Sequence, residues 1–285
     1  MSLSLVLHTL LRLKAPIILN FHGVGEGLDN LPPDTFLAIV HLLRSQGYSF
    51  ITADGFTNAR LCLQRVAALT FDDGRKNNFS VVLPLLRKTG AAATFYVCPA
   101  LIGRRVRFNK VRWSMEPFDR SLCSGLMSWS NIRELVAAGM CVGSHTLTHA
   151  DLARCPDEVA WRELVDSRRI LEHELRIPIR HLAYPFGQRT PRTRALARRA
   201  GYLTAVATGI RANPRSQLHS RYDIPRINIG PDVTLESFRS LTSLSAQLRR
   251  TMRRLLPSRL WHWRRLKPAP SVLEGNDPGL VAGSE

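Results

Sequence analysis

The feature that most constrains the fold of this 285-residue chain is an alternation of short apolar segments with longer segments of helical spacing. Short apolar runs that predict buried strands occupy residues 17–21, 66–71, 93–97, 140–143, 182–184, 205–207 and 224–227. Between them, apolar residues recur at three- and four-residue steps and predict helices over 33–47, 79–90, 130–138, 157–175 and 191–200. Strands and helices in this order form right-handed crossovers and a mostly parallel sheet. We therefore predict an α/β fold, and the number of units favours a closed or partly closed barrel over an open sheet.

The composition of the chain divides it into a large domain and a short basic end. Residues 1–240 are expected to form one domain, with an amphipathic lead-in before the first strand. Within it, residues 102–128 mix basic and aromatic side chains without a regular period and predict an insertion loop over one end of the fold. Residues 241–267 form a basic amphipathic segment, and residues 268–285 have the composition of a disordered tail.

The cysteines and the N-terminal residues indicate the cellular compartment in which the protein is expected. The five cysteines are scattered and include no C-x-x-C pair, which indicates small core residues in a reducing compartment. The N-terminus lacks a basic n-region and a small-residue cleavage site, so a signal peptide is the minority interpretation. No apolar run reaches the roughly 18 residues of a membrane-spanning helix. We therefore expect a cytoplasmic protein, with a peripheral position on the inner face of the membrane as an alternative.

The net charge of +18, with a pI near 11.0, favours anionic partners. Residues 247–267 hold eight basic side chains and no acidic one, and leucines recur beside them at helical steps. This segment is either a helix packed on the barrel with a solvated basic face, or an interfacial helix on an anionic membrane. Nucleic acid is the least favoured partner, because no nucleic-acid-binding fold or aromatic platform accompanies the charge.

Two adjacent carboxylates directly follow the apolar strand at 66–71. Asp72 and Asp73 lead into Gly74, and an Asp-Gly pair also occurs in ordinary strand-ending turns. The alternative is a chemical role, in which one carboxylate binds a metal ion while its neighbour handles protons.

Two histidines follow the strand at 140–143. His145 and His149 are four residues apart, a spacing that lets both side chains face one way on a helical turn. Such pairs are often incidental, but the carboxyl ends of parallel strands converge on one face of an α/β fold, where active sites form. Asp73, His145 and His149 would there make a catalytic type of metal site, with one position left for water. Asp72 could then act as the general base.

Three motifs resemble those of the NodB-homology polysaccharide deacetylases, carbohydrate esterase family 4. They are Thr-Phe-Asp-Asp-Gly at 70–74, Ser-His-Thr-Leu-Thr-His at 144–149 and Ala-Tyr-Pro-Phe-Gly at 183–187, within a resemblance over roughly residues 16–230. The resemblance implies a distorted (β/α) barrel of mostly parallel strands that hydrolyses N-acetyl groups on amino sugars. By the same resemblance, Asp72 is the base, and the metal ligands are Asp73, His145 and His149.

The third motif carries two further expectations from the resemblance. The backbone N–H of Phe186 corresponds to the group that helps to hold the tetrahedral oxyanion. Tyr184, Pro185 and Gly187 are expected to contact the substrate. Without the other two motifs, this stretch would be interpreted as an ordinary Pro-Gly turn.

The chain departs from the family pattern at two points. The arginine that usually opens the third motif and orients the base is replaced by Ala183, and the late histidine that protonates the leaving amine has no clear counterpart. Arg226, in the last predicted strand, is a candidate replacement for the arginine. His22, at the end of the first strand, and His219 are candidate acids.

The sequence thus predicts a metal-dependent hydrolase that removes N-acetyl groups from the amino sugars of a polysaccharide or lipid-linked saccharide. Exopolysaccharide or cell-envelope biosynthesis is the expected setting. The ligand set suits zinc and also accepts cobalt, nickel, manganese or iron. One alternative is a deformylase or O-deacetylase acting on a lipid-linked sugar. Another is a catalytically weak, carbohydrate- or membrane-binding family member, which the two departures favour and the intact metal set opposes.

Overall fold

The structure is a computed structural model that describes residues 16–26, 30–57, 65–103, 105–106, 124–208 and 221–242. Several predictions fall outside these residues: the N-terminal lead-in, most of the insertion loop, His219, and the basic segment with its tail beyond residue 242.

Seven parallel strands close into a barrel, which confirms the predicted fold class. They are β1 (Ile17–Phe21), β3 (Val66–Phe71), β4 (Ala93–Val97), β7 (Cys141–Ser144), β8 (His181–Ala183), β9 (Thr204–Thr208) and β10 (Ile224–Asn228). Their order is β1-β10-β9-β8-β7-β4-β3, and the ring closes because β1 pairs with both β10 and β3. The two-residue strand β2 (Ser49–Phe50) pairs with the start of β3.

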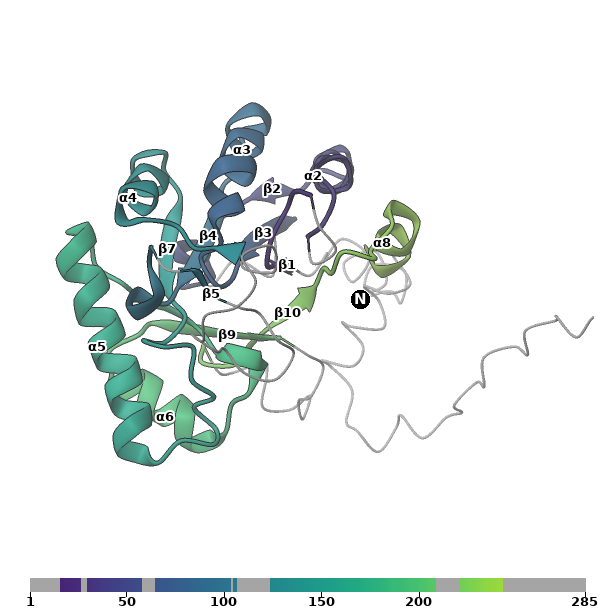
Figure 1. The fold of residues 1–285 in the computed structure, drawn as a ribbon. Helices are drawn as coiled ribbons and strands as arrows, with labels where there is room; N and C mark the ends of the chain where they lie inside the picture. Colours follow the sequence, from purple (N-terminus) through teal and green to yellow (C-terminus); the bar gives the residue numbers. More distant parts are fainter. Residues whose placement is uncertain are drawn as a thin grey trace, which may run out of the picture.

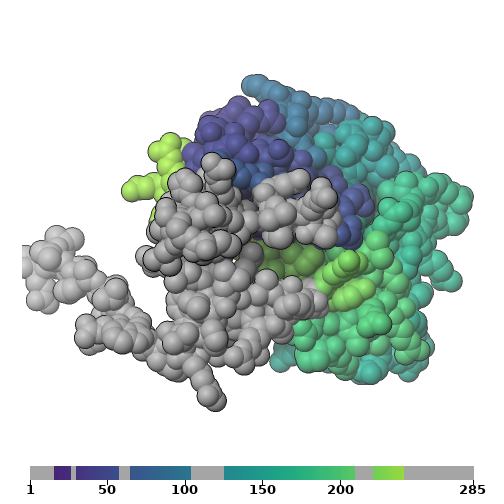
Figure 2. All heavy atoms as spheres, turned by 180° about the vertical axis from the view of Figure 1, so that it is seen from behind, coloured from purple at the N-terminus to yellow at the C-terminus, as the bar shows by residue number. Residues whose placement is uncertain are grey.

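Helices surround this barrel (Figure 1). They are α2 (Pro33–Ser45), α3 (Leu83–Thr89), α4 (Trp129–Ala137), α5 (Asp157–Leu175), α6 (Pro191–Arg199) and α8 (Leu235–Thr242). The last helix, α8, packs against α2, the first helix of the described chain, and Figure 2 shows α8 in yellow-green beside the purple N-terminal part. Closure of the ring therefore brings the two ends of the described chain together. Among the described residues, no helix is both long and apolar enough to cross a membrane.

Strand side chains alternate between an outer and an inner core. On β3, Leu69 and Phe71 belong to the large cluster beneath the helices, while Ala68 belongs to a smaller cluster inside the barrel. Phe71 stacks between Phe21 and Phe95, with ring centroids 5.1 and 5.0 Å apart. Because both faces of β3 and β4 are covered, every residue of these strands is buried, and they appear in the sequence as largely apolar runs rather than as an alternation.

A short 3-10 helix closes the amino-terminal end of the barrel. This element, η1 (Ala53–Thr57), follows β2, and its Ala53 and Phe56 pack with Ile18 and Ala68 of the inner cluster. The Ala53 N–H donates to Thr94 Oγ1 near the start of β4, at 2.8 Å. We call this end of the barrel the floor.

The predicted element boundaries differ from the structure in a few places. The helix predicted at 79–90 begins with a π-helical turn, η3 (Asn78–Val82), and ends as expected at a left-handed Gly90. Helix α4 begins before the predicted start at Ser130. Its N-cap residue is Ser128, which forms a capping box with Asn131. Inside the predicted insertion loop, β5 (Arg105–Val106) and β6 (Ser124–Gly125) pair antiparallel.

Candidate active site

The adjacent carboxylates lie at the carboxyl end of β3. Inward-facing side chains follow every second residue along this strand, through Ala68 and Thr70, and Asp72 continues the series. The chain then turns at two consecutive left-handed residues, Asp73 (φ 73°) and Gly74 (φ 74°). Asp73 is one of the residue types that tolerate this conformation. Both carboxylates are buried, with 3% and 4% exposure.

His145 directly follows β7, and its backbone N–H donates to Val97 O of β4. The expectation that His145 and His149 share a helical turn is wrong. The segment between them is an irregular loop in which Thr146 (φ 66°) and His149 (φ 67°) are left-handed. The loop nevertheless brings the two imidazole rings together, with centroids 4.8 Å apart at nearly right angles.

Asp73, His145 and His149 form a buried cluster of ligand atoms at the carboxyl end of the barrel. All three ligand atoms lie within 4.8 Å of one another. Asp73 Oδ1 is 3.7 Å from His145 Nε2 and 3.5 Å from His149 Nε2. These separations match those between donors that share one tetrahedral metal ion at about 2.0–2.2 Å.

The hydrogen bonding of His145 also fits a metal ion. Its Nδ1 lies 2.8 Å from the Ala183 carbonyl oxygen. A carbonyl oxygen only accepts hydrogen bonds, so Nδ1 carries the proton and Nε2 of the neutral ring presents a lone pair toward Asp73. Burial lowers the pKa of His145 to about 4, against the opposing charges of Asp72 and Asp73, so the ring is neutral at pH 7. Two acceptors that face each other in this way favour a cation between them.

Asp72 does not join this cluster and is bound instead by an arginine from the far end of the chain. Arg226 of β10 donates from Nη1 to Asp72 Oδ1 at 2.7 Å and from Nη2 to Asp72 Oδ2 at 2.6 Å. Its Nη1 also donates to Thr70 Oγ1 at 3.0 Å, and its guanidinium lies 5.5 Å from the Tyr96 ring centroid. The small Ala183 side chain is buried inside the barrel. Arg226 therefore fixes the orientation of the Asp72 carboxylate, whereas the side chain of Ala183 has no polar group to do so.

The two carboxyls stay ionised for different reasons. Burial by itself would raise the pKa of Asp72, but the charge and hydrogen bonds of Arg226, with His145, lower it below the usual value. Burial would also raise the pKa of Asp73, but a hydrogen bond with His149 and the charge of His22 hold it well below its usual range. Both groups are thus available as carboxylates at neutral pH.

His22, a candidate acid, directly follows β1, which pairs with β3 in the ring. Its charge acts on both Asp72 and Asp73, which places it beside the site. The other candidate acid, His219, lies outside the described residues.

The third motif forms the short 3-10 turn η6 (Pro185–Gly187) after β8. Phe186 is left-handed (φ 58°), 42% exposed, and packs edge-on against His149 with centroids 4.7 Å apart. Tyr184 is fully buried and its hydroxyl donates to Tyr222 O, so it offers no exposed side-chain surface for the predicted substrate contact. Pro185 and Gly187 are buried as well. The exposed side chain of this motif is therefore Phe186.

Sequence reasoning missed the residue that shapes the loop between His145 and His149. Glu163 of α5 is buried, and its Oε2 accepts the backbone N–H groups of Leu147 and Thr148, each at 2.9 Å. Its Oε1 accepts the Thr148 hydroxyl at 2.6 Å. A signal was available, because Glu163 interrupts the apolar stripe of Ala160 and Leu164 on the predicted helix. Arg75 was also missed: it is buried and lies 3.4 Å from Asp73 Oδ2.

Comparison with known proteins agrees with the resemblance that the three sequence motifs indicated. The family model described as polysaccharide deacetylase matches residues 63–205, half of the chain. The chain is 23% identical over 230 residues to YxkH of Bacillus subtilis (strain 168), covering 79% of this chain and 75% of that protein. It is 33% identical over 145 residues to the chitooligosaccharide deacetylase of Bradyrhizobium sp. (strain ANU 289), covering 50% of this chain and 55% of that enzyme.

Solved structures with the same fold include the following two. The Streptococcus pyogenes deacetylase PplD, solved in complex with acetate, has a TM-score of 0.64 at 23% identity, covering 80% of this chain and 97% of that one. IcaB from Ammonifex degensii has a TM-score of 0.63 at 21% identity, covering 82% of this chain and 97% of that one.

Proposed function

This chain belongs to the polysaccharide deacetylase family, and on that premise we propose that it removes N-acetyl groups from the amino sugars of a saccharide by metal-dependent hydrolysis. Members of this family are hydrolases that act on amide bonds, and this chain is one of them. The observation that carries the proposal is the convergence of Asp72 with the Asp73, His145 and His149 cluster at the carboxyl end of one barrel.

The proposed metal is zinc, held by Asp73, His145 and His149. One carboxylate and two imidazoles form a ligand set that zinc prefers, and this set leaves room for a further ligand. A divalent cation bound there would supply Lewis-acid activation of water and of the acyl carbonyl. Cobalt, nickel, manganese and iron suit the same ligands.

Asp72 is the proposed general base. It is buried, ionised at neutral pH and fixed by two hydrogen bonds from Arg226, so its orientation is set before the substrate arrives. This pairing also argues against the weak, binding-only alternative, because a binding module does not need an oriented carboxylate beside the metal ligands. Arg226 acts as a positioning residue that holds the base.

Two further groups complete the proposed chemistry. The backbone N–H of Phe186, on the turn beside His149, is proposed to stabilise the negative oxygen that develops on the acyl carbonyl. His22, next to both carboxylates, is proposed to protonate the leaving amine.

The test is acetate release from N-acetylglucosamine oligomers by the zinc-reconstituted full chain. Loss of a general base typically costs about 10²–10⁴-fold, so Asp72→Asn is expected to slow release by that factor. Asp232→Asn, at an exposed surface position, is the matched control and is expected to keep the wild-type rate. Formate release from N-formyl sugars without acetate release would favour the deformylase alternative. Release by Asp72→Asn at the wild-type rate would contradict the role of the base.

We further propose that the saccharide is polymeric or lipid-linked and is met at an anionic membrane surface on the cytoplasmic side, in exopolysaccharide or cell-envelope biosynthesis. The support is the eight basic residues of 247–267 alone. Binding of the full chain to vesicles containing anionic lipid should fall sharply when these basic residues are changed to glutamine. Unchanged binding would contradict the membrane proposal and leave the hydrolase proposal standing.

A further inference from the structure

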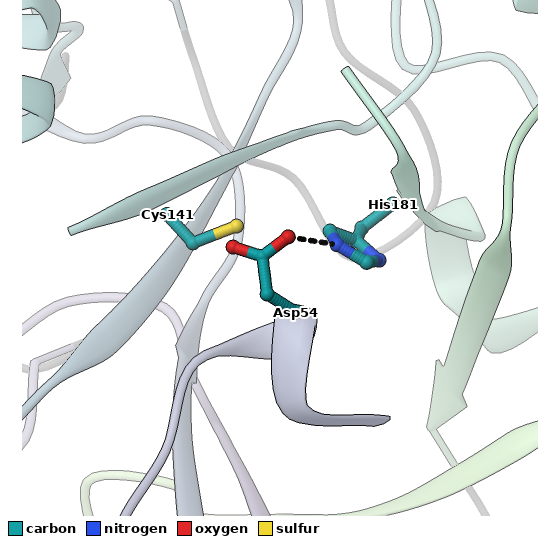
Figure 3. Close-up of side chains that lie close together, drawn as sticks. All are labelled: Asp54, Cys141 and His181. Atoms are coloured by element: carbon teal, nitrogen blue, oxygen red, sulfur yellow. Dashed lines mark hydrogen bonds and ion pairs between the residues drawn. The ribbon is translucent and has the colours of Figure 1, made fainter. Parts of the chain in front are cut away.

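A second cluster of metal-ligating side chains lies at the floor of the barrel, at the opposite end from the active site. Asp54 comes from η1, Cys141 is the first residue of β7, and His181 is the first residue of β8. Figure 3 shows the carboxylate between the other two groups, with the Cys141 sulfur and the His181 ring both directed toward it. We call these three residues the floor cluster. The proposed deacetylation does not use any of them.

The distances within the floor cluster suit a single cation. Its three ligand atoms lie within 4.8 Å of one another. Asp54 Oδ1 is 3.0 Å from His181 Nε2. Donors around a tetrahedral zinc ion, bound at about 2.0–2.3 Å, stand about 3.3–3.8 Å apart. The Asp54–His181 pair is slightly closer than this spacing and no pair of ligand atoms exceeds 4.8 Å, so the side chains would have to shift when an ion binds.

Neighbouring groups already hold the ligands in orientation. His181 is buried, and its Nδ1 lies 2.8 Å from Thr204 Oγ1, which fixes the ring with Nε2 toward Asp54. Histidines that bind a metal through one ring nitrogen typically form a hydrogen bond of this kind with the other. Burial and the nearby negative charge of Asp54 raise the pKa of the Cys141 thiol to about 12. A bound cation would supply the positive charge that stabilises the thiolate form.

The charge and accessibility of the floor cluster also fit a divalent ion. One thiolate and one carboxylate carry two negative charges, which a divalent cation neutralises. The Asp54 side chain is 57% exposed, so the cluster is open to solvent on one side and an ion has a path of entry. The guanidinium of Arg180 lies 3.9 Å from Asp54 Oδ1 and competes with a cation for that oxygen.

We propose that the floor cluster of Asp54, Cys141 and His181 is a second metal site that binds Zn²⁺ or a cation of similar softness. The mixture of sulfur, nitrogen and oxygen donors selects a borderline-soft metal over magnesium or calcium. The ion ties η1 to the amino ends of β7 and β8, three segments far apart in sequence, and so stabilises the floor. This inference does not depend on the proposed function, because the floor cluster shares no residue with the cluster of Asp73, His145 and His149.

Cobalt spectroscopy on the full chain tests the proposal. Co²⁺ bound to a thiolate gives a near-ultraviolet charge-transfer band that imidazole and carboxylate ligands do not give. Apoprotein titrated with Co²⁺ is expected to develop this band, and Zn²⁺ is expected to displace it. The band should persist in His149→Ala, which disturbs only the active-site cluster, and should vanish in Cys141→Ser.

Cysteines elsewhere in the chain require a matched control. A variant with Cys62, Cys98, Cys123 and Cys155 changed to serine keeps Cys141 and is expected to keep the band. Arg180→Gln is expected to tighten Co²⁺ binding several-fold, because it removes the competing charge. A folded wild-type protein that binds Co²⁺ without a thiolate band would overturn the proposal, whether or not the variants fold. So would a band that survives in Cys141→Ser.

Discussion

Removing the arginine that holds the base should destabilise the protein in a pH-dependent way. In Arg226→Met, a side chain of similar length replaces the guanidinium, and Asp72 loses two hydrogen bonds of 2.7 and 2.6 Å. Asp72 is 3% exposed, so water does not replace these bonds. Breaking one side of a buried ion pair costs about 3–5 kcal/mol. We expect the free energy of unfolding at neutral pH to fall by about that amount.

The sign of the pH dependence follows from the direction of the pKa shift. In the wild type the pKa of Asp72 is lowered, so the carboxylate stabilises the fold above its unfolded-state pKa of about 3.9, and this stability is lost as pH falls through the folded value. In the variant only burial and weaker charges remain, and burial raises the pKa. Once Asp72 is protonated it carries no charge, so the loss of the Arg226 guanidinium destabilises the fold much less. The stability difference between the two proteins should therefore be largest at neutral pH and shrink toward about pH 4.

Guanidinium unfolding at a series of pH values measures this difference. The double variant Arg226→Met with Asp72→Asn closes a mutant cycle that isolates the pair from other losses. The acid limb of the pH profile for acetate release should also move to higher pH in Arg226→Met. A stability loss below about 1 kcal/mol, the value of an exposed pair, or one that does not change with pH, would refute this account of the pair.

Three other changes test the rest of the site. Glu163→Ala leaves the Thr148 hydroxyl and two backbone N–H groups without their acceptor, and should weaken zinc binding about 10–100-fold in a metal titration; unchanged affinity would remove its role in shaping the loop. Gly187→Ala drives a Cβ into the backbone oxygen of Thr208 at φ 65°, whereas Gly139→Ala has open space at φ 78°. The first should therefore lower Tm well beyond the few degrees expected of the second, and equal shifts would contradict the geometry. His22→Gln should slow acetate release about 10²–10⁴-fold, whereas release at the wild-type rate would assign the acid elsewhere.

The barrel could be predicted from the sequence because its strands are buried on both faces. Val66–Phe71 and Ala93–Val97 are continuous apolar runs, and both strands have the predicted boundaries. The start of β8 was harder to delimit. His181, which begins β8, was left out because its hydrogen bond to Asp54 comes from a residue 127 positions away.

The active-site ligands could be named from motifs, but their geometry could not. The i, i+4 spacing of His145 and His149 suggested a helical turn, whereas left-handed residues and Glu163 hold them on a loop. Arg226 could be suggested only as a replacement, because its approach to Asp72 depends on barrel closure between β1 and β10. Contacts of this kind join residues that are distant in sequence, and no local pattern encodes them.

The central claim is that the cluster at the carboxyl end of the barrel is a metal-dependent deacetylation centre. Acetate release from N-acetylglucosamine oligomers by chelator-treated apoprotein, measured during titration with Zn²⁺, tests it most directly. The account predicts no release without metal and a rise that saturates as zinc binds, in the wild type and in Cys141→Ser but not in His149→Ala. Full release by the apoprotein in the presence of chelator, or zinc-dependent release that His149→Ala leaves intact, would contradict it.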